Sequence, residues 1–504
     1  MADKSPFFQR RTAGVLLHPT SLPCSESYWG DDQKNRFGTL GKDAYYFIDL
    51  MSKSGLTIWQ MLPTGPTQAD MSPYQSISAH AGNPELISLD WLLERGWINA
   101  EDFQSSNEKN IIAVRQKGAL SFYAFIETAD GKKIKHDFQN FCEQQKYWLD
   151  DFSLFCAIRK CYEGASWSNW PDELRKRHPK ALEKIRIELK KDIDVILFEQ
   201  FVFFTQWLSL KDYANQKGIY LFGDMPIFVG HDSADVWAQQ HYFHLNEEGT
   251  PLTVAGVPPD YFSETGQHWG NPHYAWQVME QDGFQWWLAR LHTQLQLFDL
   301  IRIDHFRGFE AYWEIPGNSH DARLGKWVKA PGDAFLKACF DAYPGLPLVA
   351  ENLGVITEEV EALRNQFDLP GMLVLQFAFD GNTNNPHLPH NHTRNDVIYT
   401  GTHDNDTTCG WWQSISDEGH KRVQEYCFHS NEGMPWLLIE SALASVGRMA
   451  IIPMQDFLEL DGRHRMNMPG TTDKNWVWTF SWDQVEPALA DRIRHLLAIY
   501  HRLG

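Results

Sequence analysis

Three acidic residues stand at or near the ends of apolar, β-rich segments of this 504-residue chain. Asp304 lies in LIRIDHF, Glu351 in PLVAEN and Asp404 in VIYTGTHD. Cleaving a glycosidic bond needs a protonated acid at the leaving oxygen and a carboxylate at the anomeric carbon. A third carboxylate can hold sugar hydroxyls and support the oxocarbenium-like transition state. We therefore expect this chemistry if folding brings the three acids together.

Other polar side chains share these segment ends. Asp224 lies in IYLFGDMPIFV, Arg302 stands two residues before Asp304, and His403 directly precedes Asp404. Arg302 and Asp304 would share one face of a strand, where the positive charge keeps the aspartate ionised. Taken singly, each residue is better explained as a strand-end cap or a structural ion pair. Three acids together favour a catalytic site. Because the sequence gives no distance between carboxylates, retention and inversion both stay open.

The segments that must position these side chains recur as short β-rich runs bounded by turn residues. Eight are expected to be strands: residues 13–19, 57–63, 219–229, 300–306, 347–352, 371–377, 397–404 and 449–457. Helical patterns lie between many of them. This alternation predicts an α/β protein, a (β/α)8 TIM barrel with large inserted, mostly helical subdomains. In such a barrel the carboxyl ends of all strands face the mouth where active sites are built.

The spacing of these strands is uneven. The stretch 64–218 after the second strand is far longer than a crossover needs and reads as mostly helical, so we expect an inserted subdomain there. Long Gly-, Pro- and aromatic-rich stretches, 246–273 and 458–480, follow the third and eighth strands, and loops of that length are usually functional. We predict 246–273 to be an active-site loop. No low-complexity linker divides the chain, so residues 1–504 are predicted to form a single catalytic barrel.

Composition limits the partners and the location. The net charge of −20 repels phosphate, so we expect no binding to nucleic acid or to an anionic membrane. No apolar run approaches the roughly 20 residues of a membrane helix, and the N-terminus lacks the h-region of a signal peptide. The seven cysteines are scattered without a C-x-x-C pair, which fits reduced thiols. These features predict a cytoplasmic protein.

The residues singled out above lie within motifs that cover nearly the whole chain. The motifs are GVLLHPTSLP (14–23), SPYQSISAHAGNP (72–84), GDMPIFVGHDSADVW (223–237), GVPPDYFSETGQHWGNP (256–272), RIDHFRGFEAYWEIP (302–316), AENLGVIT (350–357), GTHDNDTTCGWW (401–412) and RMNMPGTTDKNWVW (465–478). In this order they closely resemble the motifs of glycoside hydrolase family 77, the 4-α-glucanotransferases or amylomaltases. One motif alone would be weak evidence, but eight in family order are strong evidence.

The resemblance implies a retaining double displacement that moves segments of α-1,4-glucan between malto-oligosaccharides, with no cofactor and no metal. Asp304 matches the nucleophile that forms the covalent glycosyl-enzyme. Glu351 matches the general acid/base, and Asp404 matches the stabiliser of the transition state. Arg302 and His403 match supporting residues around the reacting glucose.

The resemblance also implies a set of substrate-binding residues. They are Tyr74, Asp224, Asp260, Trp269, Arg302, Phe377, His403 and Asn467. Tyr74 would stack on sugar near the cleavage point, Trp269 belongs to a loop over the site, and Phe377 would line the acceptor side. Asn467 is similar to a residue that reaches donor-side hydroxyls. For each aromatic residue taken alone, packing in the core remains the alternative.

Two groups of histidines depart from this pattern or stand outside it. His268 and His273 occupy positions where the family often has apolar residues, and we expect them to flank the glucan path and to affect acceptor preference. His387, His390 and His392 lie in a Pro- and Asn-rich stretch without a matching acidic set, so a metal site is not expected there.

Two rival functions remain. An amylase-like hydrolase could use the same three carboxylates, but the short stretch after NWVWTF leaves no room for the C-terminal β-sandwich typical of that relative. A noncatalytic glucan-binding protein would gain nothing from an intact set of three acids. A glucan phosphorylase would need a pyridoxal lysine motif, which the sequence does not show.

Overall fold

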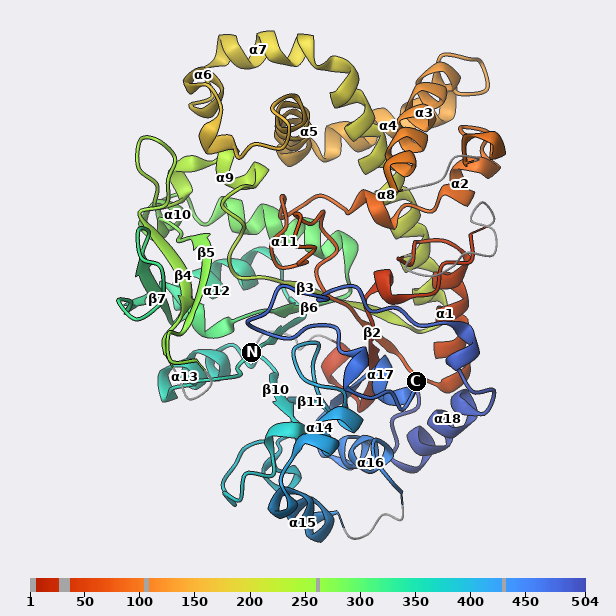
Figure 1. Cartoon of the computed structure of the whole chain (residues 1–504), viewed down its shortest axis with the longest axis vertical. Coiled ribbons are helices and arrows are strands. Elements are labelled where there is room, and N and C mark those ends of the chain that lie inside the picture. The colour runs from red at the N-terminus through yellow and green to blue at the C-terminus, as the bar shows by residue number, and fades with distance from the viewer. Residues whose placement is uncertain (1–5, 27–36, 104–107, 260–262, 428–431) are drawn as a thin grey trace.

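The computed structural model describes residues 6–26, 37–103, 108–259, 263–427 and 432–504. Its centre is an eight-stranded parallel sheet that curls into a barrel (Figure 1). In the order in which they pair, its strands are β10 (Gly371–Val374), β11 (Asp396–Tyr399), β12 (Met449–Pro453), β1 (Thr12–Leu16), β2 (Ile58–Gln60), β3 (Tyr220–Met225), β6 (Leu300–Ile303) and β9 (Leu348–Ala350). The backbone N–H of Ala350 donates to the carbonyl of Pro370 over 2.8 Å, which links the last strand to the first.

The predicted barrel and its eight strands are confirmed. Most strands end earlier than predicted; β9, for example, ends at Ala350 rather than at residue 352. The chain leaves the ladder of hydrogen bonds there. Asp304 and Glu351 directly follow the ends of β6 and β9, whereas Asp224 and Arg302 lie within β3 and β6. Strands β1, β10, β11 and β12 are buried throughout, as expected for parallel strands covered on both faces.

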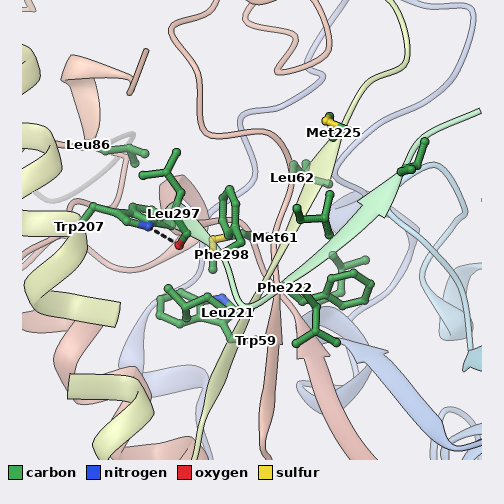
Figure 2. Packing of buried hydrophobic residues seen from close by; sticks show 14 of the residues in the cluster. Trp59, Met61, Leu62, Leu86, Trp207, Leu221, Phe222, Met225, Leu297 and Phe298 are labelled. Atoms are coloured by element: carbon green, nitrogen blue, oxygen red, sulfur yellow. Dashed lines mark hydrogen bonds between the residues drawn. The ribbon is translucent and has the colours of Figure 1, made fainter. Parts of the chain in front are cut away.

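Aromatic side chains fill the space between the barrel wall and helix α8 (Lys190–Gln216). Figure 2 shows Trp207 of α8 beside Phe298 and Leu297, with Trp59 of β2 below. The indole N–H of Trp207 donates to the Leu297 carbonyl over 2.8 Å, so this buried polar group is satisfied. A glycine is required at position 223 because a Cβ there would lie 2.4 Å from the ring of Phe298.

Helix α8 is long and apolar enough to span a membrane by length and composition, which the sequence analysis did not anticipate. However, 56% of its most apolar 18-residue stretch is buried inside the protein. Phe198, Phe203 and Trp207 on this helix are buried in the main core cluster. Its apolar character is therefore that of a core helix.

Residues 64–218 are mostly helical, and their helices gather at the top of Figure 1. The helices are α2 (Leu89–Glu94), α3 (Glu108–Ile126), α4 (Lys132–Gln144), α5 (Lys146–Cys161), α6 (Asp172–Arg175), α7 (Pro179–Glu188) and α8. The division of the chain into a barrel and this inserted subdomain stays a prediction.

The remaining helices surround the barrel. They are α1 (Lys42–Ser54), α9 (Ala234–Ala238), α10 (Trp276–Gln281), α11 (Gln285–Leu297), α12 (Gly332–Ala342), α13 (Glu358–Gln366), α14 (Thr408–Ser414), α15 (Asp417–Tyr426), α16 (Trp436–Ala444), α17 (Met454–Phe457) and α18 (Leu489–Ile499). The last helix packs beside the first (Figure 1). Helix α1 ends at Gly55, which adopts the left-handed conformation (φ 79°) that glycine tolerates best.

A second, four-stranded antiparallel sheet lies beside the barrel mouth, in the order β5 (Gln267–Pro272), β4 (Thr253–Val257), β7 (Ala311–Pro316) and β8 (Lys326–Lys329). The segment 246–273, predicted to be a loop, therefore contains two strands. The partner of β4 on its other side, β7, lies much later in the chain. A local pattern does not reveal such pairing, because only folding brings β7 alongside.

Candidate active site

Arg302 is the charged centre of the barrel mouth. From strand β6 it donates to Oδ2 of Asp224 on β3 over 2.5 Å and to Oδ1 of Asp304 over 2.9 Å. Burial opposes the charge of Arg302, but Asp224, Asp304, Tyr74 and Glu351 outweigh it and raise the pKa of Arg302 well above its usual value. Asp304, directly after β6, is thus held by a permanent cation while 27% of its side chain stays exposed.

Glu351 directly follows β9 and is buried, with 8% of its surface exposed. Its Oε1 accepts from the backbone N–H of Leu353 over 2.8 Å, and its Oε2 accepts from that of His305 over 2.7 Å. Burial raises the pKa of Glu351 to about 7; Asp304 adds to the rise, while Arg302 opposes it. Glu351 therefore carries its proton for much of the time near neutral pH.

Asp404 lies in the segment that joins β11 to α14. Its Oδ1 accepts from Nδ2 of Asn467 over 2.6 Å, and its Oδ2 lies 3.3 Å from Nε2 of His403. Arg465 donates to the backbone carbonyl of Asp404 over 3.0 Å. These contacts fix the carboxylate while 48% of the side chain remains exposed to the mouth.

Tyr74 joins the strand-end acids to an aromatic wall. Its hydroxyl donates to Oδ2 of Asp224 over 2.8 Å, and its ring stacks on the imidazole of His403 with 5.2 Å between centroids. The ring of Trp476 lies 5.8 Å from it. Tyr74 is thus part of the site itself and not of the core.

Trp269 approaches the same mouth from strand β5. Its ring meets the imidazole of His305 edge to face at 4.9 Å, next to the backbone N–H that holds Glu351. Nε2 of Gln75 donates to the Trp269 carbonyl over 3.3 Å, which ties the segment after β2 to β5. Aromatic side chains thus reach two parts of the mouth, Tyr74 beside His403 and Trp269 beside His305.

Several predicted residues lie elsewhere or remain undescribed. Phe377 ends the 3-10 helix η9 (Leu375–Phe377) with 45% of its surface exposed, and its ring contacts His387 at 5.5 Å rather than the acids. Asp260 lies outside the described residues. His268 is exposed on β5.

The expectation that His273 flanks a glucan path is wrong. Its side chain is fully buried, Nδ1 lies 3.0 Å from Oγ1 of Thr253, and the ring packs against Tyr312 and Phe228. Burial, together with the charge of His244, lowers the pKa of His273 to about 3. The residue packs the base of the antiparallel sheet, where a neutral imidazole is tolerated.

The three histidines of the stretch 387–392 bind other protein groups. His387 accepts from the Val374 N–H over 3.0 Å, His390 lies 2.8 Å from the hydroxyl of Tyr426, and His392 lies 2.7 Å from that of Ser445. Within the described part of the chain, no group of three or more His, Cys, Asp or Glu residues could hold a metal ion.

Sequence reasoning missed residues that hold the acids in place. Arg465 and Trp476 lie in the last motif, and the sequence alone did not indicate that Arg465 contacts Asp404 or that Trp476 contacts Tyr74. Asp456 of α17 is buried and accepts from Oγ1 of Thr400 over 2.6 Å and from the N–H and hydroxyl of Thr408, each over 2.7 Å. One carboxylate thus fastens both ends of the segment that carries Asp404.

The arrangement supplies what glycosidic chemistry needs. Asp304 is a partly exposed carboxylate beside the cation of Arg302, whereas Glu351 is a buried carboxyl group with a pKa raised to about 7. Environments that separate two carboxylates in this way assign one to attack and the other to proton transfer. Asp404 stands at the same mouth and is free to contact a ligand.

Comparison with known proteins agrees with this chemistry. Residues 17–484 match the family model described as 4-alpha-glucanotransferase. A 4-alpha-glucanotransferase of Thermus thermophilus is 45% identical over 506 residues, which cover 98% of this chain and 99% of the relative. A chloroplastic/amyloplastic 4-alpha-glucanotransferase of Solanum tuberosum is 43% identical, and the match covers 98% of this chain and 87% of the relative.

A solved structure supports the same match. The amylomaltase of Streptococcus agalactiae in complex with acarbose superposes with a TM-score of 0.92 at 34% identity, covering 98% of this chain and 100% of the other. The similarity thus extends over the barrel and the helical segments alike.

Proposed function

This chain belongs to the 4-alpha-glucanotransferase family, glycoside hydrolase family 77, and from that premise we propose that Asp304, Glu351 and Asp404 carry out a retaining double displacement on α-1,4-glucans. The chain is an enzyme that transfers glycosyl groups. The proposal concerns how its residues do so and on which glucans.

In the first half-reaction, a carboxylate oxygen of Asp304 attacks the anomeric carbon of the donor. The bond from that carbon to the glycosidic oxygen breaks, and the proton of Glu351 passes to this oxygen. A shortened glucan leaves, and the transferred segment stays on the enzyme as an ester of Asp304. Asp404 binds hydroxyls of the distorted sugar ring while positive charge develops on it.

In the second half-reaction, the Glu351 carboxylate removes the proton from a hydroxyl group of the acceptor glucan. The acceptor oxygen bonds to the anomeric carbon, and the ester bond to Asp304 breaks. Each linkage that is broken is remade, so neither step needs an oxidant, a reductant or a nucleotide.

The contrast between Asp304 and Glu351 is the observation that carries this assignment. The Arg302 guanidinium donates a hydrogen bond to the Asp304 carboxylate, whereas burial raises the pKa of Glu351 to about 7. A general acid/base works best with a pKa near the operating pH, because it must both give and take the proton.

Transfer requires that an acceptor sugar, and not water, reaches the glycosyl-enzyme. Tyr74 and Trp269 provide aromatic faces at the mouth on which sugar rings can stack and exclude water. We assign malto-oligosaccharides as donors and acceptors, since short α-1,4-glucans offer both a reactive bond and a free hydroxyl end.

Incubation of the purified protein with maltotriose alone tests the proposal. We expect glucose and a ladder of longer malto-oligosaccharides while the number of reducing ends stays constant. Rising reducing ends would mean that the enzyme hydrolyses its donor. No change in the sugar would contradict catalysis on this substrate. The Asp304→Asn variant should bind maltotriose without converting it.

A location in a reducing compartment such as the cytoplasm is a further part of the proposal. It is supported by the sequence, in which seven scattered cysteines without a C-x-x-C pair fit reduced thiols. Fractionation of the source cells, followed by detection of the protein, tests this location.

A further inference from the structure

We propose that a cavity between the helical segment and the barrel is an accessory binding site for α-1,4-glucan chains. The cavity, named here the α5–α11 cavity, has a volume of about 280 Å³. It lies where α5 approaches α9 and α11 (Figure 1). Its lining includes neither Asp304 nor Glu351 nor Asp404. Small-molecule sites occupy about 300–1,000 Å³, so its size lies close to the lower end of this range and suits a short oligosaccharide segment.

Aromatic side chains form two walls of the cavity. Tyr147 and Trp148 come from α5, and Trp286 faces them from α11. Tyr147 is 42% exposed, yet its hydroxyl lies 2.5 Å from Oγ1 of Thr293 and its ring meets the imidazole of His80 edge to face at 5.5 Å. The ring is therefore both accessible and rigidly held. Such aromatic faces pack against the C–H faces of sugar rings at little cost in conformational entropy.

Polar side chains at the rim are free to bind hydroxyls. Gln239, at the end of α9, and Gln285, at the start of α11, make no side-chain hydrogen bond within the part of the chain that the structure describes. Asp151 is oriented by Arg177, whose guanidinium donates to it over 2.6 Å. Amides and an oriented carboxylate together offer both donors and acceptors, as a polyhydroxylated ligand requires.

The charge of the lining favours a neutral ligand over an anion. Asp151 and Asp235 line the cavity, whereas none of the lining residues is a lysine or an arginine. Burial and, to a smaller extent, the nearby Arg290 and His292 together lower the pKa of His80 to about 3, so this imidazole is neutral at physiological pH. A phosphate or an acidic peptide would face two acidic side chains and no basic side chain in the lining.

The neutral polyhydroxylated ligand that this enzyme meets is its own glucan, so the assignment rests on the proposed function. Ser78 and His80 line the cavity, and they belong to the same short segment as Tyr74 of the active site. A long glucan bound at both places would be held near the acids for successive transfers, because the second contact is intramolecular.

Calorimetric titration with maltoheptaose in the Asp304→Asn background tests the site without turnover. We expect two binding events for this parent chain. Ala289→Trp, which fills the cavity from α11, should abolish one of them, and Tyr147→Ala should weaken it about tenfold. Tyr46→Ala, at a 55% exposed tyrosine on α1, is the matched control and should change neither event. A single event that none of the cavity variants alters would overturn the proposal.

Kinetics of the active enzyme separate this inference from the proposed function. With Asp304 intact, Tyr147→Ala and Ala289→Trp should keep kcat on maltotriose and raise KM for long amylose chains about tenfold. Unchanged KM for amylose in both variants contradicts the accessory site. Failure of the unmodified chain to disproportionate maltotriose instead contradicts the proposed function. The calorimetric result would still show whether the cavity binds a glucan. Thermal melting of each variant checks that it is folded.

Discussion

Asn467 donates a hydrogen bond of 2.6 Å from Nδ2 to Oδ1 of Asp404, although 63 residues separate them in the chain. The loop after β12 therefore supplies a partner to the acid that follows β11. The second oxygen of Asp404 approaches His403, so the carboxylate has one fixed orientation towards the mouth. This relationship makes Asn467 a residue that acts through Asp404, whatever contact it also makes with sugar.

Asn467→Ala should lower kcat about 10- to 100-fold, because a hydrogen bond to a charged group contributes about 1.5–3 kcal/mol. The loss should appear in kcat more than in KM if the bond orients Asp404 for the transition state. Steady-state rates with maltotriose measure both constants. A variant with unchanged kcat and a raised KM would show that Asn467 serves only to bind sugar.

Glu351→Gln should abolish transfer from maltotriose but retain turnover of α-glucosyl fluoride to a glucan acceptor. Fluoride leaves without needing a proton, so the first half-reaction no longer depends on Glu351. The variant is then slowed only in the second half-reaction, where the acceptor hydroxyl lacks its general base. In the unmodified enzyme, kcat/KM for maltotriose should fall above about pH 7, where Glu351 loses the required proton. Equal loss on both substrates would contradict the role of Glu351 as the acid.

The same residue should make stability depend on pH. The folded chain holds the Glu351 proton up to about pH 7, whereas the unfolded chain releases it near 4.5. The folded state thus binds more protons between these values, and the free energy of unfolding falls as pH rises through this window. Glu351→Gln should be more stable than the unmodified chain at pH 8, by at most about 3 kcal/mol. Melting curves at pH 4.5 and pH 8 should show this gain only at the higher pH.

Thr400→Val should disturb the segment that carries Asp404. The substitution keeps the shape of the side chain but removes the 2.6 Å hydrogen bond to buried Asp456, at a cost of about 1–3 kcal/mol in stability. We expect kcat to fall about tenfold as Asp404 moves. Thr400→Ser restores the hydroxyl and should recover kcat. If the serine variant recovers stability but not kcat, Asp456 stabilises the fold without positioning Asp404 for catalysis.

Tyr74→Phe isolates the contact between the tyrosine hydroxyl and Asp224. The ring remains stacked on His403, but Oδ2 of Asp224 loses a hydrogen bond of 2.8 Å. We expect kcat to fall by about tenfold with little change in melting temperature, because Tyr74 is not part of the buried core. A large drop in melting temperature with normal kcat would return Tyr74 to a structural role.

Local patterns in the sequence predicted the barrel, and they singled out acids that lie at its mouth. The strands are short apolar runs because both of their faces are covered by other parts of the protein. Asp304 and Glu351 directly follow two of these runs. A polar residue at the end of an apolar strand can be recognised in the sequence. A charged side chain is tolerated at such a position only where it reaches the barrel mouth or pairs with a partner. The mostly helical character of 64–218 was likewise readable from periodicity and length.

Tertiary structure decided everything that depends on distant partners. The sequence placed Arg302 near Asp304 but could not show that the same guanidinium also binds Asp224, which lies 78 residues away. It assigned His273 to the glucan path, whereas folding buries it, because the strands β4 and β7 that enclose it pair across the chain. The raised pKa of Glu351 arises from burial, and burial exists only once the barrel closes. Residue types thus determined which chemistry is available. The packed fold determined which carboxylate lies beside Arg302, which carboxyl group is buried and which side chains hold them.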